Sequence, residues 1–171
     1  MHNEELIIHL KTISIFKKFD ADFFAAFTPH LKINHYPKSH NLITEGDSGR
    51  DMFLLLKGDV RVNKKTLSGD TYTAALLKAE YGVFFGEVGL LTEDKRTASI
   101  ISETDIDIAT IGANEFQKFI TESPLLGAQL LFEIAASVCS RLSKSNKDTI
   151  ILYEALMGEI GTTNLGVNLA T

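Results

Sequence analysis

The sequence of 171 residues contains a single cysteine, Cys139. One cysteine cannot form an internal disulfide, which is typical of proteins that fold in a reducing cytosol. The surrounding residues, AASVCSRL, predict a small buried side chain at Cys139 rather than a nucleophile. The cysteine content therefore favours a cytoplasmic location.

Long apolar runs and targeting signals are also missing. No uninterrupted apolar run reaches the roughly 18 residues that a membrane-spanning helix needs. The N-terminus, MHNEELIIHLKTI, begins acidic and amphipathic, without the basic and apolar regions of a signal peptide. We therefore expect a soluble chain with no membrane span.

The chain has no excess of basic residues. It contains 17 Lys and Arg against 22 Asp and Glu, which gives a net charge of -5. Nucleic-acid phosphates require a basic face, so binding of nucleic acid is disfavoured. A small anionic ligand stays compatible with this charge, because a pocket can be locally positive on an acidic protein.

Catalytic motifs are absent: the sequence has no G-x-S-x-G, no P-loop and no Cys–His pairing. A catalytic metal in a cupin-type β-roll needs two histidines two residues apart on a strand, with a carboxylate and a third histidine. No histidine pair here has that spacing, so a metal site among His30, His35 and His40 is disfavoured. We expect a non-enzymatic protein without metal or cofactor. The histidines are His2, His9, His30, His35 and His40.

The order of predicted elements indicates one α+β domain. Apolar residues recur at helical spacing from Glu4 to Ile13, and Asp20 and Asp22 can cap a short helix over DFFAAF. From about Leu31, short strand-like runs alternate with Gly-, Asp- and Ser-rich turns. Short strands at this spacing, without long helices between them, predict an antiparallel sandwich or jelly-roll-like β-roll.

After Ile111 the pattern becomes helical again. Asn114 is predicted to cap NEFQKFI, and Ser123 with Pro124 opens a long helix that ends at Gly158. The expected parts are N-terminal helices at 1–30, the β-roll at 31–112, a hinge and long helix at 113–157, and a flexible tail at 158–171.

The long helix carries an apolar seam with spacings of four and three, as in a coiled coil, with two small polar members. Packing of the whole seam on the roll, and pairing of its second half with another chain as a homodimer, are both open. The seam residues are Leu131, Ala135, Val138, Leu142, Ser145, Thr149, Leu152 and Leu156.

Residues 82–99 place one carboxylate and one guanidinium among small residues. A one-turn helix starting near Glu87 would direct backbone N–H groups and its positive dipole end at one point. Arg96 has a fork of donors that suits a phosphate, and Glu87 in the same pocket would accept from a ligand hydroxyl. Phosphate and hydroxyl on one compact ligand indicate a ribose phosphate. The alternative is a surface ion pair between the two side chains.

The string FGEVGLL, followed by RTAS at 96–99, closely resembles the phosphate-binding cassette of cyclic nucleotide-binding domains. The resemblance covers nearly the whole chain. IFKKFDADFFAAF resembles the family's N-terminal helices, and TEGDSGRDMFLLLKGDVRV its early strands. The stretch from Ala113 to Leu142 resembles its hinge and C-terminal helix. Ser39 departs from the pattern, because members usually carry a glycine there.

The resemblance implies that Glu87 binds the ribose 2′-hydroxyl and Arg96 the cyclic phosphate. It implies cyclic AMP as the ligand, with cyclic GMP as the runner-up, because a threonine after the arginine resembles channel domains that accept cyclic GMP. Binding is expected to draw the cassette at 82–99 inward and let the hinge at 116–120 and the long helix cap the base. The implied ligand-binding residues are Phe85, Gly86, Glu87, Val88, Gly89, Arg96, Thr97 and Ala98.

In catabolite activator-type members, two small polar residues of the dimer helix reach the adenine. Ser145 and Asn146, after Arg141-Leu142, resemble that placement and are implied to cap the base. The alternative is that they lie on the solvated stretch of a monomer's helix.

Taken together, these features predict a non-catalytic cyclic nucleotide receptor. Three rival readings remain open: a ligand-independent dimerisation module, a family member that no longer binds ligand, and a fragment of a DNA-binding regulator. A helix-turn-helix module needs a few dozen residues, and only the 14 residues 158–171 follow the predicted helix, so we expect no DNA binding.

Overall fold

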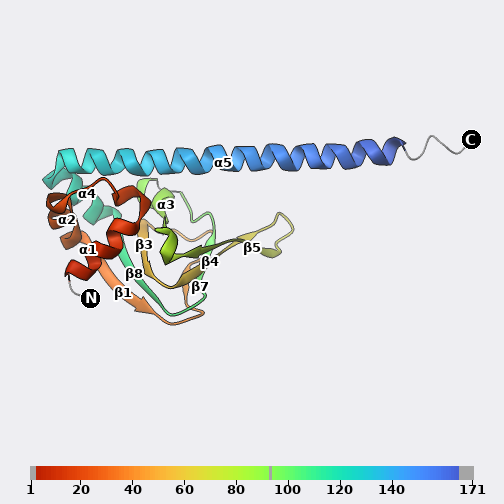
Figure 1. Ribbon diagram of the computed structural model, residues 1–171. Helices are drawn as coiled ribbons and strands as arrows, with labels where there is room; N and C mark the ends of the chain where they lie inside the picture. The colour runs from red at the N-terminus through yellow and green to blue at the C-terminus, as the bar shows by residue number, and fades with distance from the viewer. Residues whose placement is uncertain (1–2, 93, 166–171) are drawn as a thin grey trace, which may run out of the picture. The chain divides into compact units, whose positions relative to one another are not determined.

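The computed structural model describes residues 3–92 and 94–165. The chain divides into two compact units, Met1–Leu131 and Phe132–Thr171, and each is described by itself. The first unit is an antiparallel β-roll with short helices packed at one end (Figure 1). The second is the greater part of one long helix. The predicted α+β class, with an antiparallel roll between short N-terminal helices and a long C-terminal helix, is confirmed.

Short helices open the chain: α1 (Asn3–Thr12), η1 (Ser14–Phe16), α2 (Ala21–Phe27) and η2 (Thr28–His30). Asp20 caps α2 as predicted, since its side chain accepts from the backbone N–H of Phe23 at 3.1 Å. The helices are held together by fully buried aromatic rings at 16, 23, 24 and 27, with ring centroids 5.3 to 6.2 Å apart.

Within the described residues, the strands form two four-stranded antiparallel sheets. The first sheet has the order β1-β8-β3-β6 and the second the order β2-β7-β4-β5. The strands are β1 (Lys32–Tyr36), β2 (Asn41–Ile43), β3 (Asp51–Lys57), β4 (Asp59–Lys65), β5 (Thr71–Lys78), β6 (Phe84–Phe85), β7 (Ser99–Ser102) and β8 (Ile106–Gly112). A short turn, η3 (Ala79–Tyr81), links β5 to β6.

Strand β3 is buried on both faces, which explains its unbroken apolar run DMFLLLK. Phe53 and Leu55 point into the core of the roll with Phe85 and Ile108. Met52 and Leu54, at alternate positions, are fully buried on the opposite face, where α1 packs on β3. The first residue of this rigid strand, Asp51, is thereby held at the edge of the site described below.

The turn at Ser39 adopts a left-handed backbone with φ of 67°, the conformation that favours glycine. Its backbone N–H donates to the carbonyl of Ser102 at 2.8 Å, which ties the turn to β7. The departure noted in the sequence therefore falls on a position whose geometry suits glycine, away from the cassette.

Three α-helices follow or interrupt the strands: α3 (Glu87–Leu91), α4 (Ala113–Glu122) and α5 (Pro124–Leu165). Two predicted boundaries were wrong. The N-cap of α4 is Gly112, so Asn114 lies inside the helix. Gly158 does not end α5, and residues up to 165 are helical, because one glycine costs a helix only about 1 kcal/mol. Residues 166–171 of the expected tail lie outside the described part.

The second unit exposes much of its apolar surface. The seam residues Leu142, Leu152 and Leu156 are 59 to 65% exposed. Cys139 is also exposed, so the prediction of a buried cysteine was wrong. By length and composition alone, Pro124–Gly158 could cross a membrane, which is weak evidence because helices of soluble proteins meet the same criteria. The absence of a membrane span stays a prediction.

Candidate functional site

The cassette begins where β6 ends. Phe85 pairs with Phe53 across the sheet, and their rings stack with centroids 5.5 Å apart. Gly86 then turns the chain through a left-handed conformation, with φ of 81°, into α3. The predicted one-turn helix is therefore present, and Glu87 at its first position is 8% exposed.

Arg96 is buried against this turn, with 8% of the residue exposed. Its Nη1 donates to the carbonyl oxygens of Asp51 at 2.9 Å and Gly86 at 3.2 Å, and its carbon Cζ lies 5.7 Å from the centre of the Phe53 ring. Nη2 lies 3.8 Å from the carboxylate of Asp51. Among the described residues, no hydrogen bond from Nε or Nη2 accompanies these contacts.

Backbone bonds bring a distant turn to Arg96. The N–H of Arg96 donates to the carbonyl of Asp47 at 2.9 Å, and the carbonyl of Arg96 accepts from the N–H of Gly46 at 2.9 Å. These two bonds place the turn EGDSG, residues 45–49, beside the guanidinium. The sequence shows this segment as a turn but gives no signal that it meets Arg96.

Three glycines surround the guanidinium because there is no room for side chains. A Cβ at Gly49 would lie 2.8 Å from both Nε and Nη2 of Arg96. A Cβ at Gly89 would lie 2.4 Å from the carbonyl oxygen of Gly49 and 2.8 Å from Nη1. Because Gly49 has no side chain, the edge of the guanidinium that carries Nε and Nη2 is not covered by one. This edge is the one with which an arginine binds phosphate or carboxylate through two parallel hydrogen bonds.

The electrostatics of this site favour an anion. Burial lowers the pKa of the Arg96 guanidinium, and the Asp51 carboxylate only partly offsets this effect. The group stays protonated at any ordinary pH. The carboxylate of Asp51 is half-exposed and lies 3.8 Å from Nη2, so it neutralises the buried Arg96 only in part. An anion bound beside Nη2 would stabilise the guanidinium further.

Arg96 lines a pocket of 280 Å³. Its lining comes from β2 and the residue after it, from the turn at 47–49, and from Asp51 and Phe53 at the start of β3. The lining residues are Asn41, Leu42, Ile43, Thr44, Asp47, Ser48, Gly49, Asp51, Phe53 and Arg96.

The structure brings together part of the predicted set. Gly86 and Gly89 each lie against the Arg96 guanidinium, and Phe85 is part of the core of the roll. Val88 is 37% exposed and Thr97 is exposed. Of the eight predicted ligand-binding residues, Arg96 alone is among the described residues that line the pocket. Sequence reasoning missed the contribution of 41–44, 47–49, Asp51 and Phe53, which join the site through strand pairing and turn contacts.

The residues implied to cap a base lie in the second unit. Ser145 and Asn146 are exposed on α5, and the Ser145 carbonyl accepts from the Thr149 hydroxyl at 2.9 Å. Their role therefore stays a prediction. Within residues 3–92 and 94–165, no three His, Cys, Asp or Glu side chains gather in a way that could hold a metal ion.

Comparison with known proteins points to one family. The family model described as "Cyclic nucleotide-binding domain" matches residues 33–123. The chain is 38% identical over 90 residues to a cAMP-dependent protein kinase regulatory subunit of Neurospora crassa, covering 53% of this chain and 22% of that protein. It is 29% identical over 139 residues to a cAMP-activated global transcriptional regulator of Haemophilus influenzae, covering 80% and 59%. The chain therefore spans less than two thirds of either relative.

A solved structure shows the same fold. The cyclic nucleotide-binding domain from Methylobacillus flagellatus superimposes with a TM-score of 0.74 at 24% identity, over 84% of this chain and 79% of that one. At this identity the similarity supports the fold and leaves the ligand to be argued from the site.

The crowding at Gly86 generates a prediction. In Gly86→Ala the new Cβ would lie 2.7 Å from the Asp51 carbonyl oxygen and 3.0 Å from Nη1 of Arg96, at a φ of +81°. We expect a loss of about 2–4 kcal/mol in the free energy of unfolding, measured in urea, because left-handed strain and overpacking add.

Gly69→Ala is the matched control, because Gly69 has φ of +94° but no atom within 4 Å of its Cβ position. It should lose about 1–2 kcal/mol from backbone strain alone. Equal losses in the two variants would show that the contact with the guanidinium does not require glycine at position 86.

Proposed function

The chain belongs to the cyclic nucleotide-binding domain family, and on that premise we propose that it is a non-catalytic receptor for cyclic AMP, with cyclic GMP as the second candidate. The observation that carries the proposal is the buried guanidinium of Arg96, whose Nε and Nη2 edge is kept uncovered by Gly49. A cyclic phosphate supplies two acceptor oxygens and a negative charge to this edge. Cytoplasmic location remains part of the proposal.

Glu87 is proposed to accept from the ribose 2′-hydroxyl. It is buried at the first turn of α3, next to the glycine whose carbonyl accepts from Arg96. A carboxylate accepts hydrogen bonds and repels a phosphate, so the two charged side chains divide the ligand between them. Phe85, Val88, Gly89, Thr97 and Ala98 complete the proposed set, with Thr97 as the residue that would favour cyclic GMP.

A short chain of contacts supports transmission of binding to α4. The carbonyl of Asp51 accepts from Arg96 at 2.9 Å, and the carbonyl of the preceding residue, Arg50, accepts from the N–H of Ala113 at 2.8 Å. Ala113 is the first residue of α4. A ligand that shifts Arg96 therefore acts on the backbone segment that holds the start of α4. The ligand shifts the equilibrium between two conformations of the chain because it binds one of them more tightly, and no chemical step is needed.

The first test is calorimetric titration of the purified chain, freed of carried-over ligand, with cyclic AMP and cyclic GMP. Arg96→Ala should weaken binding by about 2–5 kcal/mol, because a buried phosphate would lose its partner. Arg96→Lys should fall between the alanine variant and the wild type, since it keeps the charge and loses the fork.

Arg61→Ala is the control, because Arg61 of β4 pairs with Glu103 and does not line the pocket. Binding within threefold of wild type for Arg96→Ala would contradict the site assignment. No binding of either nucleotide by the wild type would favour a ligand-independent dimerisation module or a family member that does not take these ligands.

The second test addresses Glu87. Wild type should bind the 2′-deoxy nucleotide more weakly than the parent nucleotide by about 1.5–3 kcal/mol, because the carboxylate would lose its donor. Glu87→Gln should discriminate less between the two ligands. Glu80→Gln is the control, because that side chain is 64% exposed and lies 3.7 Å from Lys78. Equal affinity of the wild type for both nucleotides would show that Glu87 does not contact the ribose.

The third test addresses the second unit. We propose that the seam of α5 pairs with a second copy and that Ser145 and Asn146 contact the base, which their exposure and that of Leu142 and Leu152 permit. Sedimentation should then show a dimer. Replacing both polar residues by alanine should weaken cyclic AMP binding by about 1–3 kcal/mol without unfolding the chain.

Ser143→Ala is the control for this test, because Ser143 is exposed but lies off the seam. A monomer with and without ligand would contradict the paired helix. The contacts at Glu87 and Arg96 would then have to account for binding.

A further inference from the structure

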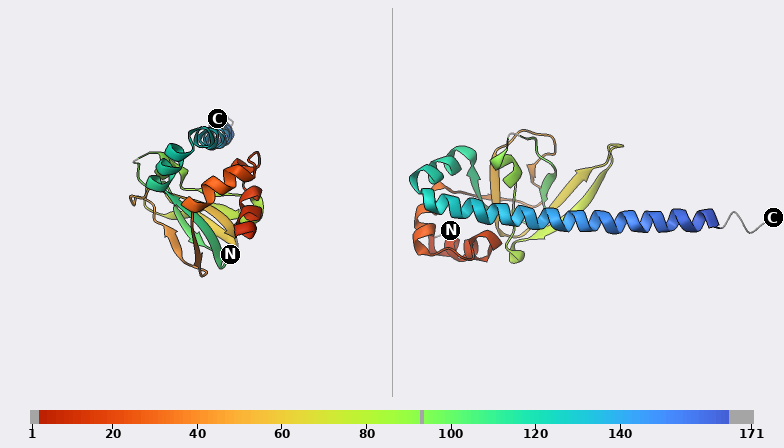
Figure 2. Two further views of the ribbon diagram at one scale, coloured as in Figure 1. Left: turned by 90° about the vertical axis from the view of Figure 1, so that its left-hand side faces the viewer. Right: turned by 90° about the horizontal axis from the view of Figure 1, so that it is seen from above.

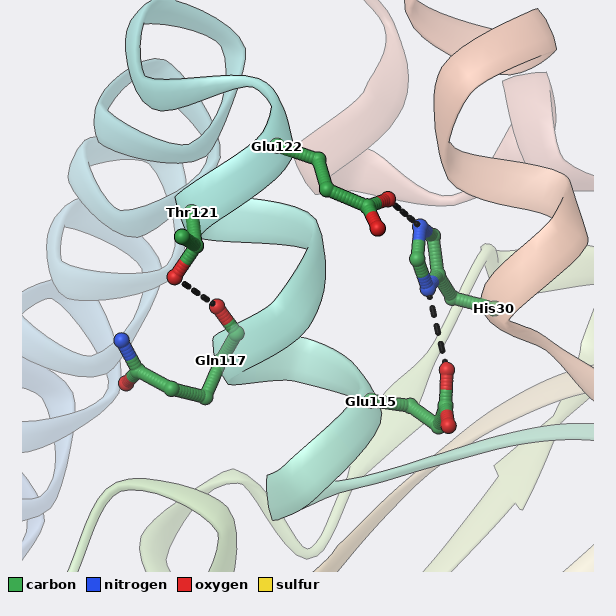
Figure 3. Close-up of polar contacts among 5 residues, drawn as sticks. All are labelled: His30, Glu115, Gln117, Thr121 and Glu122. Carbon is green, nitrogen blue, oxygen red and sulfur yellow. Dashed lines mark hydrogen bonds and ion pairs between the residues drawn. The ribbon is translucent and has the colours of Figure 1, made fainter.

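His30, at the end of η2, lies between two carboxylates of α4 (Figure 3). Its Nδ1 is 3.1 Å from Oε2 of Glu115, and its Nε2 is 3.4 Å from Oε2 of Glu122. The residue is 8% exposed, and its ring meets Phe119 edge-on with centroids 5.8 Å apart. The two glutamates lie two helical turns apart on one face of α4, so one imidazole ring contacts both the first and the last turn of the helix.

The protonation state of the ring decides how many of these contacts are favourable. A neutral imidazole has one N–H donor and one lone pair, whereas imidazolium has two donors. Both carboxylates are therefore satisfied only when His30 carries a proton. In either neutral tautomer, one ring nitrogen directs a lone pair at a carboxylate oxygen, which is unfavourable in a buried contact.

The other charged groups near this contact come from three segments. Lys32 of β1, Arg50, and Asp51 of β3 line the same 440 Å³ pocket as His30 and Glu115. Lys118 of α4 also acts on Glu115. The hydrogen bond from His30 is the largest influence on Glu115 and lowers the pKa of that carboxyl, against a smaller opposing effect of burial. Glu115 thus stays ionised at a pH where a free glutamate begins to protonate.

We propose that His30 is a proton-operated latch that holds α4 against the N-terminal helices, and that loss of the ring proton loosens α4. The remaining attachment of α4 on this side is apolar: Phe119 packs edge-on against Phe23 and Phe27 with centroids 5.8 and 5.1 Å apart. These ring contacts do not change with pH. They hold α4 in place at any pH, and the His30 contacts add to them while the ring is protonated.

The latch also bears on the start of α5. Gly127 packs so closely on α4 that a Cβ there would lie 2.9 Å from Cα of Ile120. The N–H of Gly127 donates to the carbonyl of Ser123 at 2.8 Å, directly after α4. The first turns of α5 are therefore packed directly against α4. A change that weakens the packing of α4 on the N-terminal helices also affects the start of α5. The inference goes beyond the proposed nucleotide binding and needs no ligand.

The direction of the pH dependence follows from the two kinds of group. Imidazole is the side chain that changes charge between about pH 5 and 8, and the ring of His30 can donate to both carboxylates only while it holds its second proton. The contribution of Glu115 is present above the ordinary carboxyl range and is lost as the pH falls through its lowered pKa. Docking of α4 should therefore be tightest in mildly acidic solution.

The test is hydrogen exchange of the full chain without nucleotide, corrected for the intrinsic effect of pH on exchange. Protection of the α4 amides, residues 113–122, should fall about fivefold between pH 6 and pH 8, as expected for the loss of one ion pair between the ring and a carboxylate. His30→Gln should remove this dependence. His35→Gln is the matched control: His35 lies 2.8 Å from Asp107 but is 65% exposed and remote from α4, so the dependence should persist.

Glu122→Gln provides a second variant that should fold, because its side chain is 54% exposed. It removes the charge that faces Nε2 and should reduce the dependence to about a third or less of its wild-type size. Flat protection of α4 from pH 6 to 8 in the wild type, or an unchanged dependence in Glu122→Gln, would overturn the latch. Because no nucleotide is present, neither result depends on the proposed receptor function.

Discussion

The Arg96 guanidinium is buried where three backbone segments meet, and the contacts of this one residue join them. Nη1 donates to the carbonyl of Gly86, directly after β6, and to the carbonyl of Asp51 at the start of β3, while the main chain of Arg96 holds the turn at 45–49. Gly49, Gly86 and Gly89 provide the space that the planar group fills. A buried cation is costly unless it is hydrogen-bonded or paired with an anion. The two carbonyl oxygens meet part of that requirement through Nη1.

Helix α4 connects this site to the rest of the first unit. Its first residue, Ala113, is bonded to the backbone just before β3, and its Phe119 ring packs on two aromatic rings of α2. Figure 2 shows α4 and the N-terminal helices gathered at the same end of the roll. The helix is therefore held from two sides by different interactions: a backbone bond on the side of Arg96, and aromatic packing with the His30 contacts on the other.

Much of the first unit could be predicted from local patterns. Asp20 caps α2 because its carboxylate accepts from a free backbone N–H in the first turn of the helix. The apolar runs bounded by turn residues form strands, as predicted. The boundaries that failed depend on weaker preferences. Gly112 outcompeted Asn114 as the N-cap of α4, and a glycine at 158 was too small a penalty to end a long helix. The exposure of Cys139 was not predictable, because burial on a helix depends on what covers it.

The sequence by itself determined the chemistry of the cassette: a glycine before a one-turn helix, a glutamate at its start and an arginine nine residues later. These features are local, because they depend on residues close together in the sequence and not on how the rest of the chain folds. The tertiary structure decided which partners surround the arginine. Gly49, Asp51 and Phe53 lie more than 40 residues before Arg96, and strand pairing and two backbone bonds bring them to it. It also joined His30 to Glu115, 85 residues apart, because packing of helices brings together residues that no sequence period relates.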